Sequence, residues 1–315
     1  MIGIADWVAA YSDGDTDLSE TDERLLMVLA QQRVLTTDQL HRLLFAHASD
    51  RWCRHVLQRM LAVGLLERIP LRRAGSRRLY AWFISPTGRR MLDTEERPRS
   101  YRADAARAAN TVSRHLLDGN EVGIAFASHA HRYGHDCGPL DWEHEIPHKI
   151  ADGPFEGKGS DWLRSDLRVR AQLHDPVGGD VVITRLVEVD RATEAIPVLL
   201  DKVRRYTRML LYTPSAGTRL AHAYGSRRPA WAGNYQRFPK LCLVFSNRSE
   251  EALARRIDSL FDVAVADPAI GPHLEELGVY AATLDTVTSA GPYERIWRAP
   301  RRDPEDLVDL LGRPA

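Results

Sequence analysis

The residues best suited to chemistry are carboxylates in segments that alternate like β-strands. In the run 186–190 (Leu-Val-Glu-Val-Asp), alternation places Glu188 and Asp190 on one face of a strand. Two carboxylates at that spacing repel each other, and a divalent cation is the usual compensation. Asp166 and Glu145 lie in two earlier strand-like runs. The sequence therefore predicts a Mg²⁺ site in which Asp166 and Glu188 bind the metal, with Asp190 and Glu145 close by.

Ion pairs would neutralise the same carboxylates without any metal. Arginines are abundant around the alternating run, and an arginine beside a carboxylate is an ordinary structural pairing. The arginines considered as partners of Glu188 and Asp190 are Arg168, Arg170, Arg191 and Arg204.

The elements that would position these carboxylates form a second domain, predicted over residues 102–315. Its pattern is a helix over 101–117 and strands near 141–147, 164–173 and 181–190. A helix near 193–212, a strand over 240–246, a helix over 249–263 and a strand over 278–284 follow. The stretch 213–238, rich in Gly, Pro and Ser, is predicted to be a long loop.

This order resembles the PD-(D/E)xK nuclease superfamily, in which a helix precedes three strands. Position by position, Asp166 matches the first metal-binding Asp, Glu188 matches the second carboxylate, and Glu145 resembles the acidic residue often found upstream. The resemblance implies cleavage of phosphodiester bonds by bound Mg²⁺, which polarises the phosphate and acidifies a water molecule.

Two positions depart from the superfamily pattern. Asp190 stands where the superfamily has Lys, and Ser165 stands where it often has Pro. In divergent members the lysine lies in the next helix, and Lys202 occupies that place here. Lys202 is therefore the candidate for orienting the attacking water, and a solvated helix lysine is the alternative.

The N-terminal part, residues 20–95, has the pattern of a winged helix-turn-helix. Three helices with apolar faces precede two short strands, and residues 51–90 hold ten arginines against the single acid Glu67. This basic surface predicts binding to double-stranded DNA, although such modules also dock proteins. The predicted contacts are Arg51, Arg54, Gln58 and Arg59 on the third helix, and Arg72, Arg73, Arg77 and Arg78 in the hairpin.

An acidic segment precedes this module and a polar segment follows it. Residues 1–19 are predicted to be a flexible acidic arm, and residues 96–101 a linker between the domains. Residues 5–23 could fold over the basic face and compete with DNA, although acidic arms are also common solubilising segments. The predicted fold class is thus α+β, a winged helix followed by an α/β nuclease-like domain.

Composition excludes several classes. Apolar residues make up 44% and the formal net charge is zero, while no apolar run is long enough to cross a membrane, so a cytoplasmic protein without membrane contact is expected. Six possible zinc ligands cluster within residues 129–148, but their spacing matches no zinc-finger pattern. Zinc is therefore disfavoured. The ligands concerned are His129, His131, His135, Cys137, His144 and His148.

The whole chain resembles the actinobacterial replication-relaxation family of plasmids and integrative conjugative elements. The segments that carry the resemblance are 21–26, 186–194 and 201–206. It implies a DNA transaction on a mobile element, with replication or transfer proteins and a second copy of the chain as candidate partners. Two hypotheses stay open: a Mg²⁺-dependent endonuclease or nickase, and a non-catalytic DNA-binding accessory or transcriptional regulator with a degenerate nuclease fold.

Overall fold

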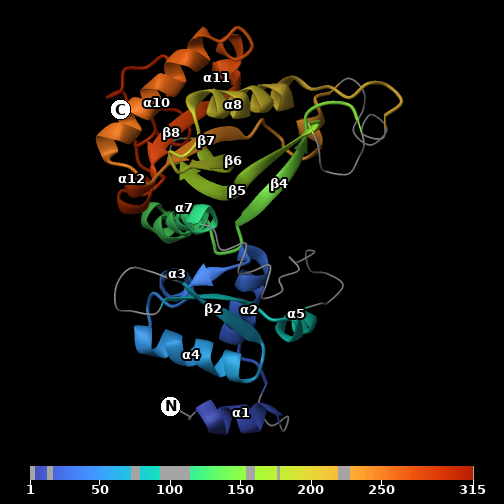
Figure 1. The fold of residues 1–315 in the computed structure, drawn as a ribbon, viewed down its shortest axis with the longest axis vertical. Helices are drawn as coiled ribbons and strands as arrows, with labels where there is room; N and C mark the ends of the chain where they lie inside the picture. Colours follow the sequence, from blue (N-terminus) through green and yellow to red (C-terminus); the bar gives the residue numbers. More distant parts are fainter. Residues whose placement is uncertain are drawn as a thin grey trace. The chain divides into compact units, whose positions relative to one another are not determined.

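The computed structural model describes residues 4–12, 17–71, 79–92, 114–153, 160–175, 178–218 and 228–314 (Figure 1). The chain divides into two compact units, one comprising residues 1–124 with 138–140 and the other residues 125–137 with 141–315. The described residues form helices together with one three-stranded and one five-stranded sheet. The predicted α+β class is confirmed at this level.

The N-terminal unit contains a small antiparallel sheet of order β1-β3-β2, in which Leu35 pairs with Trp82 and Leu66 with Ile84. Its core contains fully buried leucines, including Leu25 of α2, together with the buried aromatic residues Trp82 and Phe83. The elements are α1 (Ile4–Ser12), α2 (Glu20–Gln32), β1 (Leu35–Thr36), α3 (Thr37–Leu44), α4 (Asp50–Ala62), β2 (Leu66–Leu71), β3 (Leu79–Ile84) and α5 (Pro86–Leu92).

Polar side chains cap the N-termini of helices in this unit. The Ser19 hydroxyl accepts a hydrogen bond from the backbone N–H of Asp22, and the Asp22 carboxylate accepts one from the backbone N–H of Ser19. Thr36 and Gln39 form the same reciprocal cap on α3. Each cap satisfies N–H groups that a helix leaves without an internal partner.

Helix α1 corrects the prediction of a flexible arm over residues 1–19. Residues Ile4–Ser12 are helical and carry Asp6 as their one charged residue, so this part of the segment is apolar enough to pack. Helix α1 contacts α4, and the hydroxyl of Tyr11 donates to the sulfur of Met91 over 3.2 Å. The acids after Ser12 therefore follow a helix instead of belonging to one continuous acidic arm.

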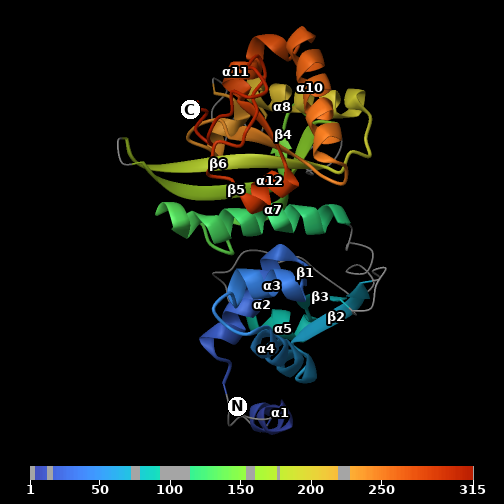
Figure 2. The same cartoon turned by 90° about the vertical axis from the view of Figure 1, so that its left-hand side faces the viewer.

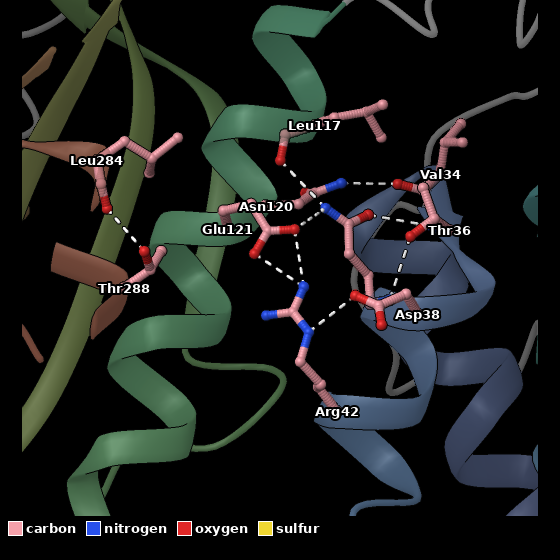
Figure 3. Close-up of polar contacts among 10 residues, drawn as sticks. Val34, Thr36, Asp38, Arg42, Leu117, Asn120, Glu121, Leu284 and Thr288 are labelled. Carbon is pink, nitrogen blue, oxygen red and sulfur yellow. Dashed lines mark hydrogen bonds and ion pairs between the residues drawn. The ribbon is translucent and has the colours of Figure 1, made fainter. Parts of the chain in front are cut away.

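Helix α7 (Arg114–Ala130) is divided between the two units at Ile124. Its N-terminal part is tied to the N-terminal unit, as Figure 3 shows: Asn120 donates to the carbonyl of Val34 over 2.7 Å, and Arg42 donates to both oxygens of Glu121 over 2.8 Å. Gln39 also donates to Glu121, over 2.9 Å. The boundary between units thus lies well after the predicted linker at 96–101, itself outside the described residues.

The C-terminal unit is built on the five-stranded sheet, of order β4-β5-β6-β7-β8. Strands β4, β5 and β6 are antiparallel, while β6, β7 and β8 are parallel. The elements are β4 (Trp142–Lys149), β5 (Trp162–Asp175), β6 (Gly179–Asp190), α8 (Ile196–Leu211), β7 (Lys240–Phe245), α10 (Glu250–Ala266), α11 (Leu274–Leu277), β8 (Val279–Thr283) and α12 (Leu284–Ser289).

Helices α8, α10 and α11 lie on one face of this sheet and α12 on the other (Figure 2). The main core forms under α8 and α10, where Leu186, Leu243 and Phe245 of the sheet pack with Leu199 and Leu260 of the helices. Glu188 shares a strand face with Leu186, so the same two helices cover it. Within the described parts of the chain, no helix is both long and apolar enough to span a membrane.

Candidate functional site

Asp166 and Glu188 meet where β5 pairs with β6. Leu167 pairs with Val187 in the antiparallel register, so the next position along places Asp166 beside Glu188. The Asp166 carboxylate accepts a hydrogen bond from the backbone N–H of Val189 over 2.9 Å, and it lies close enough to the Glu188 carboxyl group to raise the pKa of Glu188. Glu188 is only 4% exposed. The two predicted metal ligands are therefore adjacent.

Helix α8 places two further polar groups on Glu188. Lys202 and Tyr206 are four residues apart and so share one helix face. The hydroxyl of Tyr206 donates to Oε1 of Glu188 over 2.5 Å, and Nζ of Lys202 lies 3.5 Å from Oε2 of Glu188. Nζ of Lys202 also lies 3.4 Å from a carboxylate oxygen of Glu194. The predicted Lys202 is thus in the cluster, together with Tyr206 and Glu194, which the sequence did not single out.

The electrostatics of the cluster favour a proton shared by the two carboxyl groups. Burial raises the pKa of Glu188 well above its ordinary value, and the Asp166 charge raises it further, while Lys202 and Tyr206 act in the opposite direction. Burial lowers the pKa of Lys202, but Glu188, Asp166 and Glu194 outweigh that effect and the pKa is raised. Lys202 is therefore cationic at neutral pH, beside a carboxyl pair that holds a proton when no cation replaces it.

The donor set fits a magnesium ion. Carboxylate oxygens are its preferred protein ligands, and Mg²⁺ commonly takes only one or two of them while keeping several waters. Asp166 and Glu188 supply such a pair, and a bound cation would release their shared proton. Within the described residues, no group of three or more His, Cys, Asp or Glu side chains is arranged to hold a metal. Water or a substrate oxygen would therefore complete the coordination.

Asp190 lies on the same strand face but has a different partner. Nε of Arg256, from α10, donates to Oδ2 of Asp190 over 2.5 Å, and the backbone N–H of Ala192 donates to Oδ1 over 3.0 Å. Both side chains are largely buried. This corrects the prediction that Asp190 joins the metal site: its charge is neutralised by an arginine, though by none of the four considered from the sequence.

Glu145 lies on β4 opposite Asp166, between the pairs His144–Leu167 and Ile146–Ser165. Its φ of 54° falls in a region that residues with a Cβ rarely adopt. The residue is exposed. Glu145 thus lies beside the carboxylate pair on strained backbone. Its exposed side chain is not part of the buried cluster.

A second polar network lies beside the first, and no pattern in the sequence predicted it. Nε of Arg168 donates to Glu143 over 2.9 Å, and the Arg168 guanidinium interacts electrostatically with the nearby hydroxyl of Tyr235. That hydroxyl is also 2.7 Å from Nε2 of His148, and the two rings stack. Burial, with a further contribution from Arg168, lowers the pKa of His148 to about 4, so the imidazole is neutral at pH 7. Tyr235 comes from the long predicted loop, where no periodic signal marks it.

The predicted DNA contacts on α4 differ in exposure and in whether the side chain already forms an ion pair within the protein. Arg51 is exposed, Gln58 is half-buried, and Arg54 is exposed in an ion pair of 2.6 Å with Asp50. Arg59 is only 16% exposed and pairs with Asp22, which is buried. We therefore withdraw Arg59 from the predicted contacts, because its guanidinium neutralises a capping carboxylate. The hairpin arginines Arg72, Arg73, Arg77 and Arg78 lie outside the described residues.

The histidines and cysteine of residues 129–148 do not form a metal centre in the part of the chain that the structure describes. Nδ1 of His135 accepts from the backbone N–H of His174, and His148 belongs to the Tyr235 network. Burial raises the pKa of the Cys137 thiol to about 12, which disfavours a thiolate ligand.

The fold and the carboxylate cluster define an α+β protein in which half-buried Asp166 and buried Glu188 form a pair, with a helix lysine beside it. The replication-relaxation family matches residues 26–219, well over half of the chain, and the chain belongs to this family. The matched region runs from α2 past the end of α8 and so includes the carboxylate cluster. Membership indicates a role in the replication or relaxation of plasmids or mobile elements. No curated protein and no solved structure matches the chain.

Proposed function

We propose that this protein binds double-stranded DNA through its N-terminal unit and cleaves a phosphodiester bond with Mg²⁺ at Asp166 and Glu188. It would act as an endonuclease or nickase in the replication or transfer of a mobile element. The observation that carries the proposal is the meeting of Asp166, Glu188 and Lys202, which come from two strands and a helix. The order of these elements resembles that of the PD-(D/E)xK superfamily.

The N-terminal unit supports DNA binding by the order and surface of its elements. Helices α2, α3 and α4 precede the β2–β3 hairpin, and β1 adds a third strand, as in a winged helix. Helix α4 is third in that series and would enter the major groove. Its exposed side carries Arg51, Arg54 and Gln58. Charged and amide side chains of this kind bind phosphates and base edges.

Each residue of the cluster has a distinct task in cleavage. Bound Mg²⁺ would polarise the phosphate and lower the pKa of a water ligand. Asp166 and Glu188 would hold the ion, and Tyr206 fixes the Glu188 carboxylate through its hydrogen bond of 2.5 Å. The Lys202 side chain is 30% exposed, so its ammonium can reach both Glu188 and a substrate oxygen. Lys202 would orient the nucleophile or stabilise charge on the phosphate.

The non-catalytic accessory is the second candidate, and one observation favours it. The cavity lined by Glu188 and Lys202 has a volume of only about 10 Å³, which is at the lower limit for one water molecule. A site this closed would have to open, or bind substrate from the Asp166 side. If it does neither, the carboxyl pair and Lys202 would be a structural ion-pair network.

Cleavage assays on supercoiled plasmid separate the two candidates. With Mg²⁺ or Mn²⁺, the wild type should produce open circles, and Asp166→Asn and Glu188→Gln should abolish them. Glu251→Gln is the matched control, since Glu251 is an exposed carboxylate on α10. Equal cutting by Glu188→Gln would overturn the assignment of the site. Plasmid binding without cutting in either cation would favour the accessory.

A further inference from the structure

The face of β5 that carries Asp166 continues as a row of polar side chains. Burial alternates strictly from Ser165 to His174: odd positions are buried, whereas Asp166 and Arg168 are half-buried and Arg170 is exposed. Consecutive side chains on one strand face are about 6.8 Å apart. Arg168 and Arg170 thus follow Asp166 along one line, with a spacing close to that of successive phosphates in a DNA strand.

Arg168 is held in a fixed orientation beside the carboxylate pair. Nε and Nη2 both donate to Glu143, and the guanidinium lies close enough to the Tyr235 hydroxyl for the two groups to interact electrostatically. Tyr235 is in turn anchored by His148 over 2.7 Å. A guanidinium has five N–H donors, so the two hydrogen bonds to Glu143 leave three for the nearby Tyr235 hydroxyl and a ligand. An arginine fixed in this way binds an oxyanion with little further loss of side-chain entropy.

Arg170 supplies a cation that the protein leaves exposed. In the ranges that the structure describes, no carboxylate lies within ion-pair distance of its guanidinium. Burial raises the pKa of Tyr235, and the positive charges of Arg168 and Arg170 act in the opposite direction, so both guanidinium groups lie near its hydroxyl. The two guanidinium groups therefore lie on the same side of the Asp166–Glu188 pair: Arg170 is exposed, whereas Arg168 is 15% exposed and is ion-paired with Glu143, which is itself 40% exposed.

We propose that Arg168 and Arg170 bind successive backbone phosphates of double-stranded DNA, adjacent to the phosphate at Asp166 and Glu188. Tyr235 is a positioning residue that acts through Arg168. The inference rests on the proposed function and adds to it a DNA-binding surface in the C-terminal unit, separate from α4. This surface sets which phosphodiester bond reaches the carboxylate pair, because strand β5 fixes the distance between the arginines and Asp166.

The test measures the affinity of the full chain for a linear DNA duplex at several salt concentrations without divalent cations, so that no cleavage occurs. Each phosphate contact contributes roughly 0.9 to the slope of log affinity against log salt. Arg170→Gln should reduce the slope by about 0.9, and Arg168→Gln with Arg170→Gln by about twice that. Arg255→Gln, an exposed arginine on α10, should leave it unchanged.

A double-mutant cycle tests the role of Tyr235. Tyr235→Phe keeps the ring and removes its hydroxyl hydrogen bonds, so it should weaken binding, and Arg168→Gln should then add little. Fully additive effects would overturn the positioning role. Unchanged slopes in the single and double arginine variants, with DNA still bound, would overturn the inference and leave the proposed function standing. If the wild type bound no duplex at any salt concentration, the proposed function and the inference would both fail.

Discussion

Replacing Tyr206 with Phe isolates the hydrogen bond that holds the Glu188 carboxylate. Tyr206 is fully buried and its hydroxyl donates to Glu188 over 2.5 Å, so the substitution removes one donor and keeps the ring. A hydrogen bond to a charged group contributes about 1.5–3 kcal/mol. The ionised Glu188 needed for metal binding loses this stabilisation, and Mg²⁺ affinity at fixed pH should fall roughly tenfold to a hundredfold.

The pH dependence of this effect has a defined sign. The pKa of buried Glu188 is raised on folding, so the metal-free protein gains stability from the protonated carboxyl at low pH and loses it as pH rises through the folded pKa. Mg²⁺ binds the ionised form, so the increase in melting temperature that it causes should grow with pH. Because the Tyr206 hydrogen bond lowers the pKa of Glu188, Tyr206→Phe should need a higher pH for the same increase.

Thermal unfolding from pH 6 to 9, with and without Mg²⁺, measures this effect. Lys202→Met serves as a second variant, because loss of the ammonium also raises the pKa of Glu188 and should move the Mg²⁺ response in the same direction. If a folded Tyr206→Phe protein showed the same Mg²⁺-induced increase in melting temperature as the wild type at every pH, the Tyr206 hydrogen bond would not support metal binding by Glu188.

The remaining predictions concern the ion pairs. Arg256→Ala leaves the buried Asp190 carboxylate without its ion-pair partner and should lower the free energy of unfolding by about 3–5 kcal/mol. Urea unfolding measures this loss, and a value below about 1 kcal/mol would contradict a buried ion pair. Arg59→Ala should destabilise the protein in the same way, because Asp22 is buried, and should reduce DNA affinity no more than that loss of folded protein explains. Arg51→Ala should leave the melting temperature within about 2 °C of the wild type, since surface substitutions usually change stability by less than about 0.5 kcal/mol. The same substitution should weaken duplex binding in a gel-shift assay. Unchanged binding would show that α4 is not part of the DNA interface.

Local patterns were sufficient to predict the carboxylate pair. Strand alternation at residues 164–173 and 181–190 fixes which side chains share a face, and antiparallel pairing of consecutive strands then sets Asp166 beside Glu188. The position of Lys202 follows from the helix that comes next in the chain. These features depend on neighbouring segments, and their spacing is fixed by backbone geometry.

Contacts between distant segments could not be predicted in this way. Alternation puts Asp190 on the face of Glu188, but only the packing of α10 reveals that Arg256 covers it. Tyr235 lies in a loop without periodicity, and its partners His148 and Arg168 come from two other strands. Arg59 fits the pattern of an exposed helix face, but the cap of α2 brings Asp22 against it. In each case the polar partner of a buried group comes from a segment distant in the sequence, and only tertiary packing brings the two together.

The most direct test of the account is an anomalous diffraction map from crystals of the protein grown with Mn²⁺ near pH 8. Mn²⁺ takes the same oxygen ligands as Mg²⁺ and scatters anomalously. We expect an anomalous peak bound by carboxylate oxygens of both Asp166 and Glu188, and we expect this peak to be lost in crystals of Glu188→Gln. An anomalous map without a peak at this pair, with the Lys202 ammonium still beside Glu188, would contradict the metal site and with it the proposed cleavage.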